Sequence, residues 1–235
     1  MSTINQEILS LLTTTSDVLV GFADLRPLAK EVRQNFNYGV VIALPYSREA
    51  MDNSKIAPSQ LHWEEYLAMG QRIPPILDEI ADLLIQKQYK ALALAKHNVV
   101  VNEDLRTVLP YKTVATLAGI GWIGKCAALI THKYGSAVRM GVVLTNAPLE
   151  CGEPITESLC PAQCTVCVDV CPGHAVKGEL WEVGIDRDEL FDARACQKAA
   201  SAMARPDAPP YTVFCGLCVA NCPFTQGAKL PNLLR

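Results

Sequence analysis

The chain has 235 residues, half of them apolar, and its 21 basic and 24 acidic residues give a net charge of −3. This composition supports one large domain or two small ones with a proper core, and it excludes the strongly basic surface typical of nucleic-acid or anionic-membrane binding. The N-terminus lacks the features of a signal peptide, and the apolar runs are too short to span a membrane. We therefore expect a cytoplasmic protein without a membrane partner.

Residues 1–150 alternate apolar patterns of the helical and the strand type. Ser2 or Thr3 is the expected cap of the first helix. Pro74 and Pro75 should interrupt the longest helix, because proline lacks the N–H that a helix needs and clashes with the preceding turn. In chain order, the patterns predict a helix over 5–12, buried strands over 17–23 and 38–46, helices over 62–87 and 111–118, and a pair of strands over 128–133 and 137–145.

The stretch AGIGWIGKC at 118–126 fits two nucleotide-binding motifs. Its glycines match the dinucleotide fingerprint G-x-G-x-x-G, and its last glycine with Lys125 completes the phosphate-loop motif G-x-x-x-x-G-K. The preceding segment has a helical pattern where the fingerprint needs a strand, and residues 140–146 lack its acidic residue. Cys126 stands where a phosphate loop needs Ser or Thr. We therefore reject both nucleotide interpretations.

Eight of the ten cysteines lie in two groups toward the C-terminal end. Each group contains C-x-x-C-x-x-x-C-P, the spacing of bacterial two-cluster ferredoxins, in which the last cysteine ligates the other cluster. Metal ligation is favoured over disulfides, because the chain has a sizeable core and no export signal. The predicted ligand sets of the two [4Fe–4S] clusters are Cys160, Cys164, Cys167 and Cys222, and Cys171, Cys196, Cys215 and Cys218.

Structural zinc is the alternative, since paired cysteines also form tetrahedral zinc sites, although the repeated motif is rare among them. One departure concerns Cys160, which is separated from Cys164 by three residues instead of the usual two. Cys126 and Cys151 fall outside the pattern and are expected to be buried free thiols. The cysteine spacing thus predicts an irregular cluster domain over 151–235, after a cofactor- or partner-binding domain over 1–150.

The stretch YKTVATLAGIGWIGKCAALITHKYGSAVRMGVVLTNAPLE at 111–150, followed by the two cysteine motifs with FDARAC and FCGLCVANCP, resembles the epoxyqueuosine reductase family. The cluster domain of that family is related to the corrinoid reductive dehalogenases. The resemblance implies an α+β protein with two parts. These are an N-terminal α/β sheet domain like that of nitroreductases and cobalamin reductases, and a C-terminal double [4Fe–4S] ferredoxin-like domain. It also implies cobalamin as a cofactor, with flavin less favoured.

The resemblance also implies roles for individual residues. Asp104 is the nearest counterpart of the family's catalytic aspartate, although the Thr-Gly that follows it in the family is missing here. The family's C-terminal helical repeats, which help to hold tRNA, have no counterpart after Pro223. We therefore expect a short paralogue, for which the net charge also argues against tRNA as substrate. The implied cofactor-facing residues are Gly119, Gly121, Trp122, Gly124 and Lys125.

Three functions remain open on the sequence. The favoured one is an iron–sulfur oxidoreductase, in which both clusters pass single electrons to a corrinoid or another acceptor for reductive chemistry on an unknown substrate. The second is a ferredoxin-like electron-transfer protein without its own catalytic cofactor. The third is a reductase that handles a corrinoid or flavin for another enzyme. All three predict a low-potential electron donor of the ferredoxin or flavodoxin type and a small-molecule or cofactor acceptor.

Overall fold

The computed structural model describes residues 3–94, 100–203 and 214–227. The chain forms two compact units, and each unit combines three separate segments of the sequence. The first unit comprises Met1–Pro45, Leu67–Ile120 and Arg139–Ile155, and the second comprises Tyr46–Tyr66, Gly121–Val138 and Thr156–Arg235. The predicted boundary between residues 150 and 151 stays a prediction.

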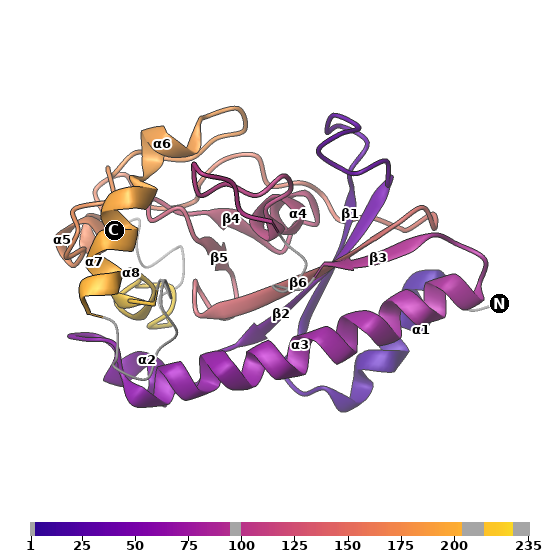
Figure 1. Cartoon of the computed structure of the whole chain (residues 1–235), viewed down its shortest axis with the longest axis horizontal. Coiled ribbons are helices and arrows are strands. Elements are labelled where there is room, and N and C mark those ends of the chain that lie inside the picture. Colours follow the sequence, from indigo (N-terminus) through magenta and orange to yellow (C-terminus); the bar gives the residue numbers. More distant parts are fainter. Residues whose placement is uncertain (1–2, 95–99, 204–213, 228–235) are drawn as a thin grey trace. The chain divides into compact units, whose positions relative to one another are not determined.

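A four-stranded sheet with the order β1-β2-β6-β3 forms the centre of the first unit (Figure 1). Val20 lies opposite Ile42 in the antiparallel pair β1–β2, and Leu92 lies opposite Leu144 in the antiparallel pair β3–β6. The six inner residues of β2 are all buried, as its apolar run predicts. The strands are β1 (Leu19–Asp24), β2 (Tyr38–Pro45), β3 (Ala91–Leu94) and β6 (Val138–Thr145).

The prediction that 128–133 and 137–145 pair with each other is wrong. The segment 129–131 is strand β5 (Leu129–Thr131), and it pairs with β4 (Gly121–Ile123) in a separate two-stranded sheet. Only a single bridge, from Thr131 to Gly135, joins the first segment to the turn. The apolar second segment instead joins the larger sheet between β2 and β3 as β6, where its last five residues are buried. Burial on that sheet outweighed the local turn.

Both short predicted helices of the first unit are confirmed. Helix α1 (Ile4–Leu11) is followed by a 3₁₀ turn, η1 (Leu12–Thr14), and it begins at a capping box. In this box the Thr3 hydroxyl accepts from the backbone of Gln6, while the Gln6 side chain accepts from the backbone of Thr3. Helix α4 (Tyr111–Leu117) packs against β1 and β2.

Helix α3 (Gln60–Gln86) runs without interruption through Pro74 and Pro75, so the expected break is wrong. Each proline removes one backbone hydrogen bond, but burial of a continuous apolar face compensates for the loss. An added Cβ on Gly141 of β6 would lie 2.6 Å from Ile73, which shows how closely the helix packs on this strand. The buried apolar side chains of the helix in this unit are Met69, Ile73, Leu77, Ile80, Ala81 and Leu84.

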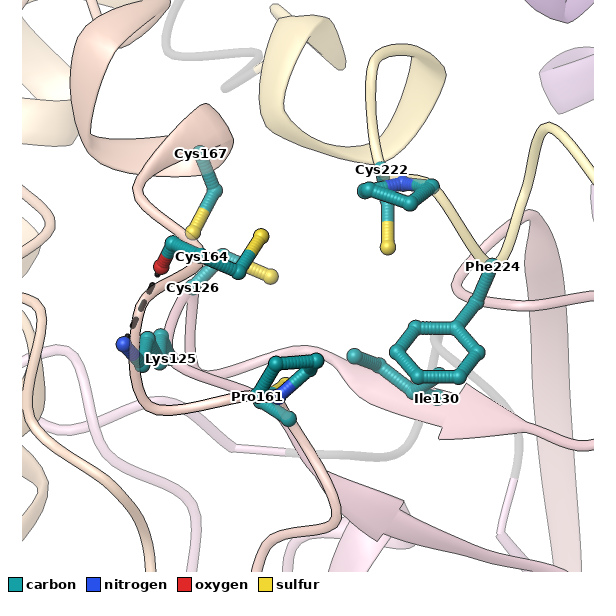
Figure 2. Close-up of a pocket in the computed structure, with 10 residues that line it drawn as sticks. Lys125, Cys126, Ile130, Pro161, Cys164, Cys167, Cys222 and Phe224 are labelled. Carbon is teal, nitrogen blue, oxygen red and sulfur yellow. Dashed lines mark hydrogen bonds between the residues drawn. The ribbon is translucent and has the colours of Figure 1, made fainter. Parts of the chain in front are cut away.

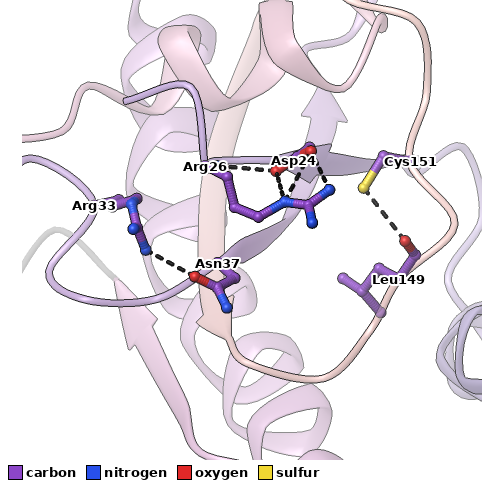
Figure 3. A network of polar contacts seen from close by, with 6 residues as sticks. All are labelled: Asp24, Arg26, Arg33, Asn37, Leu149 and Cys151. Atoms are coloured by element: carbon purple, nitrogen blue, oxygen red, sulfur yellow. Dashed lines mark hydrogen bonds and ion pairs between the residues drawn. The ribbon is translucent and has the colours of Figure 1, made fainter. Parts of the chain in front are cut away.

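A polar network holds the connection between β1 and β2 (Figure 3). The Arg26 guanidinium donates to both carboxylate oxygens of Asp24, the shortest distance being 2.7 Å, and this hydrogen bonding lowers the pKa of Asp24. Arg33 is 9% exposed and donates from Nη1 to Phe36 O at 2.7 Å and to Asn37 Oδ1 at 2.8 Å. The connection is therefore held by charge-assisted hydrogen bonds, exposed at Arg26 and buried at Arg33, rather than by regular structure.

The second unit is built from short elements. Helix α8 packs against both α2 and α5. A small apolar cluster of Ala50, Met51, Ala137 and Ala220 lies at the packing of α2 with α8. The helices of this unit, besides the start of α3, are α2 (Arg48–Asn53), α5 (Val166–Asp169), α6 (Arg187–Leu190), α7 (Ala193–Ala202) and α8 (Leu217–Ala220). Across the described residues, no helix combines the length and the apolar character that crossing a membrane requires.

Candidate metal centre

Five cysteines from three separate parts of the sequence line one cavity in the second unit, and Cys126 is one of them (Figure 2). Cys167 comes from α5, and Cys222 follows α8. The walls between the thiols are apolar and come from Ile130, Pro161, Pro223 and Phe224. The cysteines of this cavity that belong to the first predicted ligand set are Cys160, Cys164, Cys167 and Cys222, which is the whole set.

The second predicted set is also gathered in the second unit. Burial, together with the nearby thiols of Cys171 and Cys215, raises the pKa of Cys196 to about 11. Burial and Cys171 likewise raise the pKa of Cys215. Hydrogen bonding, burial and the thiols of Cys215 and Cys196 raise the pKa of Cys218. Cys171, Cys196 and Cys218 also belong to one cluster of packed side chains.

Backbone N–H groups point at several of these sulfur atoms. The N–H of Ala175 donates to the Sγ of Cys171 at 3.2 Å. The N–H of Leu217 lowers the pKa of Cys215 against the larger effect of burial, and the N–H groups of Phe224 and Thr225 do the same for Cys222. Such donors stabilise negative charge on sulfur and so partly offset the effect of burial at Cys215 and Cys222.

Cys126 lies between the two sets of cysteines. It is 7% exposed, as expected for a buried thiol, and it packs with Cys171, Ala175 and Val176. Hydrogen bonding to Cys126 is also the largest cause of the raised pKa of Cys167 in one set and of Cys218 in the other. The cysteine motifs do not reveal this role, because Cys126 is far from both of them in the sequence.

The glycine-rich loop crosses from one unit to the other, and its residues have packing roles. Gly119 has a φ of +71°, and an added Cβ would lie 2.4 Å from the backbone oxygen of Glu153. An added Cβ on Gly121 would lie 2.3 Å from the backbone oxygen of Ile130, which precedes Thr131, the partner of Gly121 in the β4–β5 pair. The loop runs from a helix into a strand, which is the reverse of a nucleotide-binding turn.

The remaining loop residues implied to face a cofactor lie in two places. Trp122 is fully buried and makes edge contacts with the rings of His132 and Phe224, so it is a core residue. Gly124 and Lys125 lie at the cysteine cavity. An added Cβ on Gly124 would be 3.4 Å from the Sγ of Cys160, and Lys125 lines the cavity itself. Their contact with a corrinoid stays a prediction.

Asp104 and Cys151 both belong to the first unit. Asp104 lies in an exposed turn, where its backbone N–H donates to Oδ1 of Asn102 at 3.1 Å. It does not line the cysteine cavity, and its role as an acid stays a prediction. Cys151 is half-buried rather than buried, and its thiol donates to the carbonyl of Leu149 at 3.5 Å (Figure 3).

His62 is a further residue of the second unit that the sequence did not single out. It is 3% exposed and packs between the rings of Tyr46 and Phe214. Its Nδ1 lies 3.2 Å from the hydroxyl of Ser54. An added Cβ on Gly216 would lie 2.6 Å from the imidazole, so His62 supports the turn between two predicted ligands. Burial lowers its pKa to about 4.

All ten cysteines are described, and none forms a disulfide. Among the described residues, no group of three or more His, Cys, Asp or Glu side chains is gathered tightly enough for a single metal ion.

Comparison with known proteins confirms the resemblance read from the sequence. The chain is 35% identical over 127 residues to a protein of Gloeobacter violaceus named epoxyqueuosine reductase, and the match covers 50% of this chain. It covers 36% of that protein, so the chain spans about a third of this relative. No profile of a known protein family matches the chain.

Solved structures confirm the mixed helix-and-sheet fold. A reductive dehalogenase, described in terms of B12-dependent dehalogenation, matches with a TM-score of 0.66 at 16% identity over 92% of this chain and 30% of that one. An epoxyqueuosine reductase in complex with a tRNA-Tyr stem loop matches with a TM-score of 0.59 at 20% identity, over 95% of this chain and 66% of that one. The prediction against tRNA gains no support from this second protein.

Proposed function

We propose that the chain is an iron–sulfur oxidoreductase that passes single electrons through two [4Fe–4S] clusters to a corrinoid or another acceptor bound at residues 1–150. The observation that carries the proposal is the cavity shared by Cys160, Cys164, Cys167 and Cys222, with the other four predicted ligands in the same compact unit. The relatives named epoxyqueuosine reductase and the B12-dependent dehalogenase support a reductive reaction. The donor we propose is a low-potential protein of the ferredoxin or flavodoxin type.

The residues present fit the proposed clusters. Each motif begins a short helix, so that Cys167 and Cys218 stand one residue after the first residue of α5 and α8. Backbone N–H groups stabilise the sulfur charge of Cys171, Cys215 and Cys222. A [4Fe–4S] cluster supplies one-electron transfer at low potential when bound.

The chain's own groups would perform two tasks in this function. The thiols hold the clusters as thiolates, in the sets Cys160, Cys164, Cys167, Cys222 and Cys171, Cys196, Cys215, Cys218. The apolar side chains of Ile130 and Phe224, with Pro161 and Pro223, exclude water from the first of these sites. A dry environment with few charges keeps the potential of a cluster sensitive to each nearby group.

The first experiment measures iron, sulfide, cobalt, zinc and flavin in protein purified without oxygen, before and after incubation with cobalamin. We expect about eight irons per chain and retention of cobalamin. About eight irons without affinity for cobalamin or flavin would overturn the corrinoid assignment and leave a ferredoxin-like electron carrier. Zinc in place of iron would overturn the proposal altogether.

A matched pair of variants tests the ligand assignment. Cys167→Ala should lose about four irons and lower the free energy of unfolding, because bound metal contributes folding free energy. Cys151→Ala changes the same residue type in the first unit and should retain all the iron. Full iron content in Cys167→Ala, measured alongside the control, would contradict the assignment.

A further inference from the structure

Lys125 is a buried cation at the cysteine cavity. Its side chain is 5% exposed. Its ammonium Nζ donates to the carbonyl oxygen of Ala162 at 2.7 Å and to that of Cys164 at 3.0 Å. Figure 2 shows the second of these bonds. Both carbonyls belong to the loop that carries Cys160 and Cys164. An ammonium has three N–H donors, so these two bonds fix its position and leave one donor.

The surroundings of Lys125 supply no carboxylate. Within the part of the chain that the structure describes, Lys125 forms no ion pair, and the cavity beside it is lined only by apolar side chains and thiols. A buried charge without a counter-charge is strongly unfavourable. The chemistry of the cavity therefore calls for a negatively charged occupant, and a cubane with four thiolate ligands carries net negative charge.

The cysteines of the cavity lie in apolar surroundings. Cys222 is 7% exposed, and Ile130, Pro161, Pro223 and Phe224 complete the lining. Negative charge held in such a place is costly, and a fixed positive charge close by reduces that cost.

Lys125 also holds the one part of the motif that departs from the usual spacing. Three residues separate Cys160 from Cys164, and the loop turns with Cys164 N–H donating to Pro161 O at 3.0 Å. The two carbonyls that Lys125 binds lie within and at the end of this longer turn. The lysine thus stabilises a loop that is one residue longer than the standard one.

We propose that Lys125 is a positioning residue and the fixed counter-charge of the cluster held by Cys160, Cys164, Cys167 and Cys222. Its ammonium holds the longer ligand loop and raises the reduction potential of that cluster. Each added electron increases the negative charge of a cluster, so a fixed cation stabilises the reduced form more than the oxidised form. This inference rests on the proposed function, because it requires that the cysteines bind clusters.

The test compares three variants of the anaerobically reconstituted full chain. Lys125→Gln removes the charge but keeps an N–H₂ group that donates hydrogen bonds, and Lys125→Arg keeps the charge. Lys177→Gln is the control, since it removes one lysine charge at an exposed position of the same unit. The readouts are iron content and the midpoint potentials of both clusters, followed by electron paramagnetic resonance during a redox titration.

We expect Lys125→Gln to make reduction of one cluster about tenfold less favourable, which is a fall of 59 mV for a one-electron couple. Lys125→Arg and Lys177→Gln should stay close to the wild-type potentials. Equal potentials in Lys125→Gln and the wild type, with about eight irons in each, would overturn the inference. A wild-type protein that binds no iron would instead overturn the proposed function, so the two failures are distinguishable.

Loss of a cluster in Lys125→Gln also decides the question. If Lys125→Arg keeps its full iron content while Lys125→Gln loses half, the charge is required and the inference is supported. If both variants lose the same cluster, the shape of the lysine side chain matters rather than its charge, and the counter-charge role is overturned.

Discussion

Tyr111 and Trp122 each bury a polar atom that finds no partner among the described residues, namely the phenolic oxygen and the indole Nε1. Burial raises the pKa of Tyr111 to about 12. A buried hydroxyl without a partner costs stability, because it gave up hydrogen bonds to water. The two residues differ from His62, whose buried ring has Ser54 beside it.

We predict that Tyr111→Phe raises the free energy of unfolding by about 1 kcal/mol. The substitution removes the buried oxygen and keeps the ring. Tyr89→Phe, at a half-buried position of the same unit, is the control and should change stability by less than about 0.5 kcal/mol. Denaturant unfolding of the two variants measures the difference. Destabilisation by Tyr111→Phe would show that the hydroxyl has a stabilising partner.

His62 should make the protein less stable in acid. Its pKa is about 4 when folded and 6.5 in the unfolded chain, so between these values the unfolded state binds more protons. Stability therefore falls as the pH drops from 6.5 to 4, by about 3 kcal/mol in total, and is independent of this group above pH 6.5.

The prediction is checked by denaturant unfolding at several pH values. His62→Phe should flatten the acid dependence between pH 4 and 6.5, while His174→Asn, at an exposed position, should leave it unchanged. Asparagine suits that control because residue 174 has a φ of +48°. Parallel acid dependence in the wild type and His62→Phe would contradict the prediction.

The end of α4 and the start of β4 show what the glycine-rich loop does. Gly119 ends the helix in a left-handed conformation and passes close to the backbone of Glu153. We expect Gly119→Ala to lower the free energy of unfolding by at least about 2 kcal/mol, from backbone strain together with this contact.

Gly184→Ala is the matched control for that substitution. Gly184 also has a positive φ, of +100°, but an added Cβ would meet nothing within 4 Å. It should therefore cost about 1 kcal/mol, from backbone strain alone. Thermal or denaturant unfolding of both variants separates the two causes, and equal losses would show that the approach of Glu153 is unimportant.

Elements with a strong local signal could be predicted from the sequence. The capping box at Thr3 and the apolar run of β2 specify their own structure. The pairing of β5 and β6 was mispredicted, because a strand's partner depends on distant apolar segments that local pattern does not reveal. The break expected at Pro74 and Pro75 was mispredicted for a similar reason. Burial of the helix outweighed the local cost of the two prolines.

For the candidate site, the sequence reveals the spacing of the predicted ligands but not the residues that surround them. The C-x-x-C motifs identify their own chemistry from residues close in sequence. Lys125, Cys126 and His62 approach the cysteine groups only through folding. Cys126, the nearest of the three in sequence, precedes Cys160 by 34 residues. The sequence therefore predicted the thiols but not the charges and hydrogen bonds around them.

At the scale of the whole molecule, the two units are interleaved along the sequence. The second unit includes Gly121–Val138 and Tyr46–Tyr66 together with the cysteine motifs. The relatives match over most of this chain in fold, while this chain covers 30% of the dehalogenase and 66% of the tRNA-bound reductase. The chain therefore shares this fold over most of its own length while spanning only part of either protein.

The interleaving has a consequence for biosynthesis. A ribosome releases Lys125 and Cys126 well before Cys160. Cys222 emerges later still, within the last of the three segments that make the second unit. Domains that are continuous in sequence fold as they emerge, N-terminal first, but this unit is incomplete until the segment that carries Cys222 has been translated. A metal held jointly by Cys160 and Cys222 can bind only after that point, when all three segments of the sheet unit have already been made.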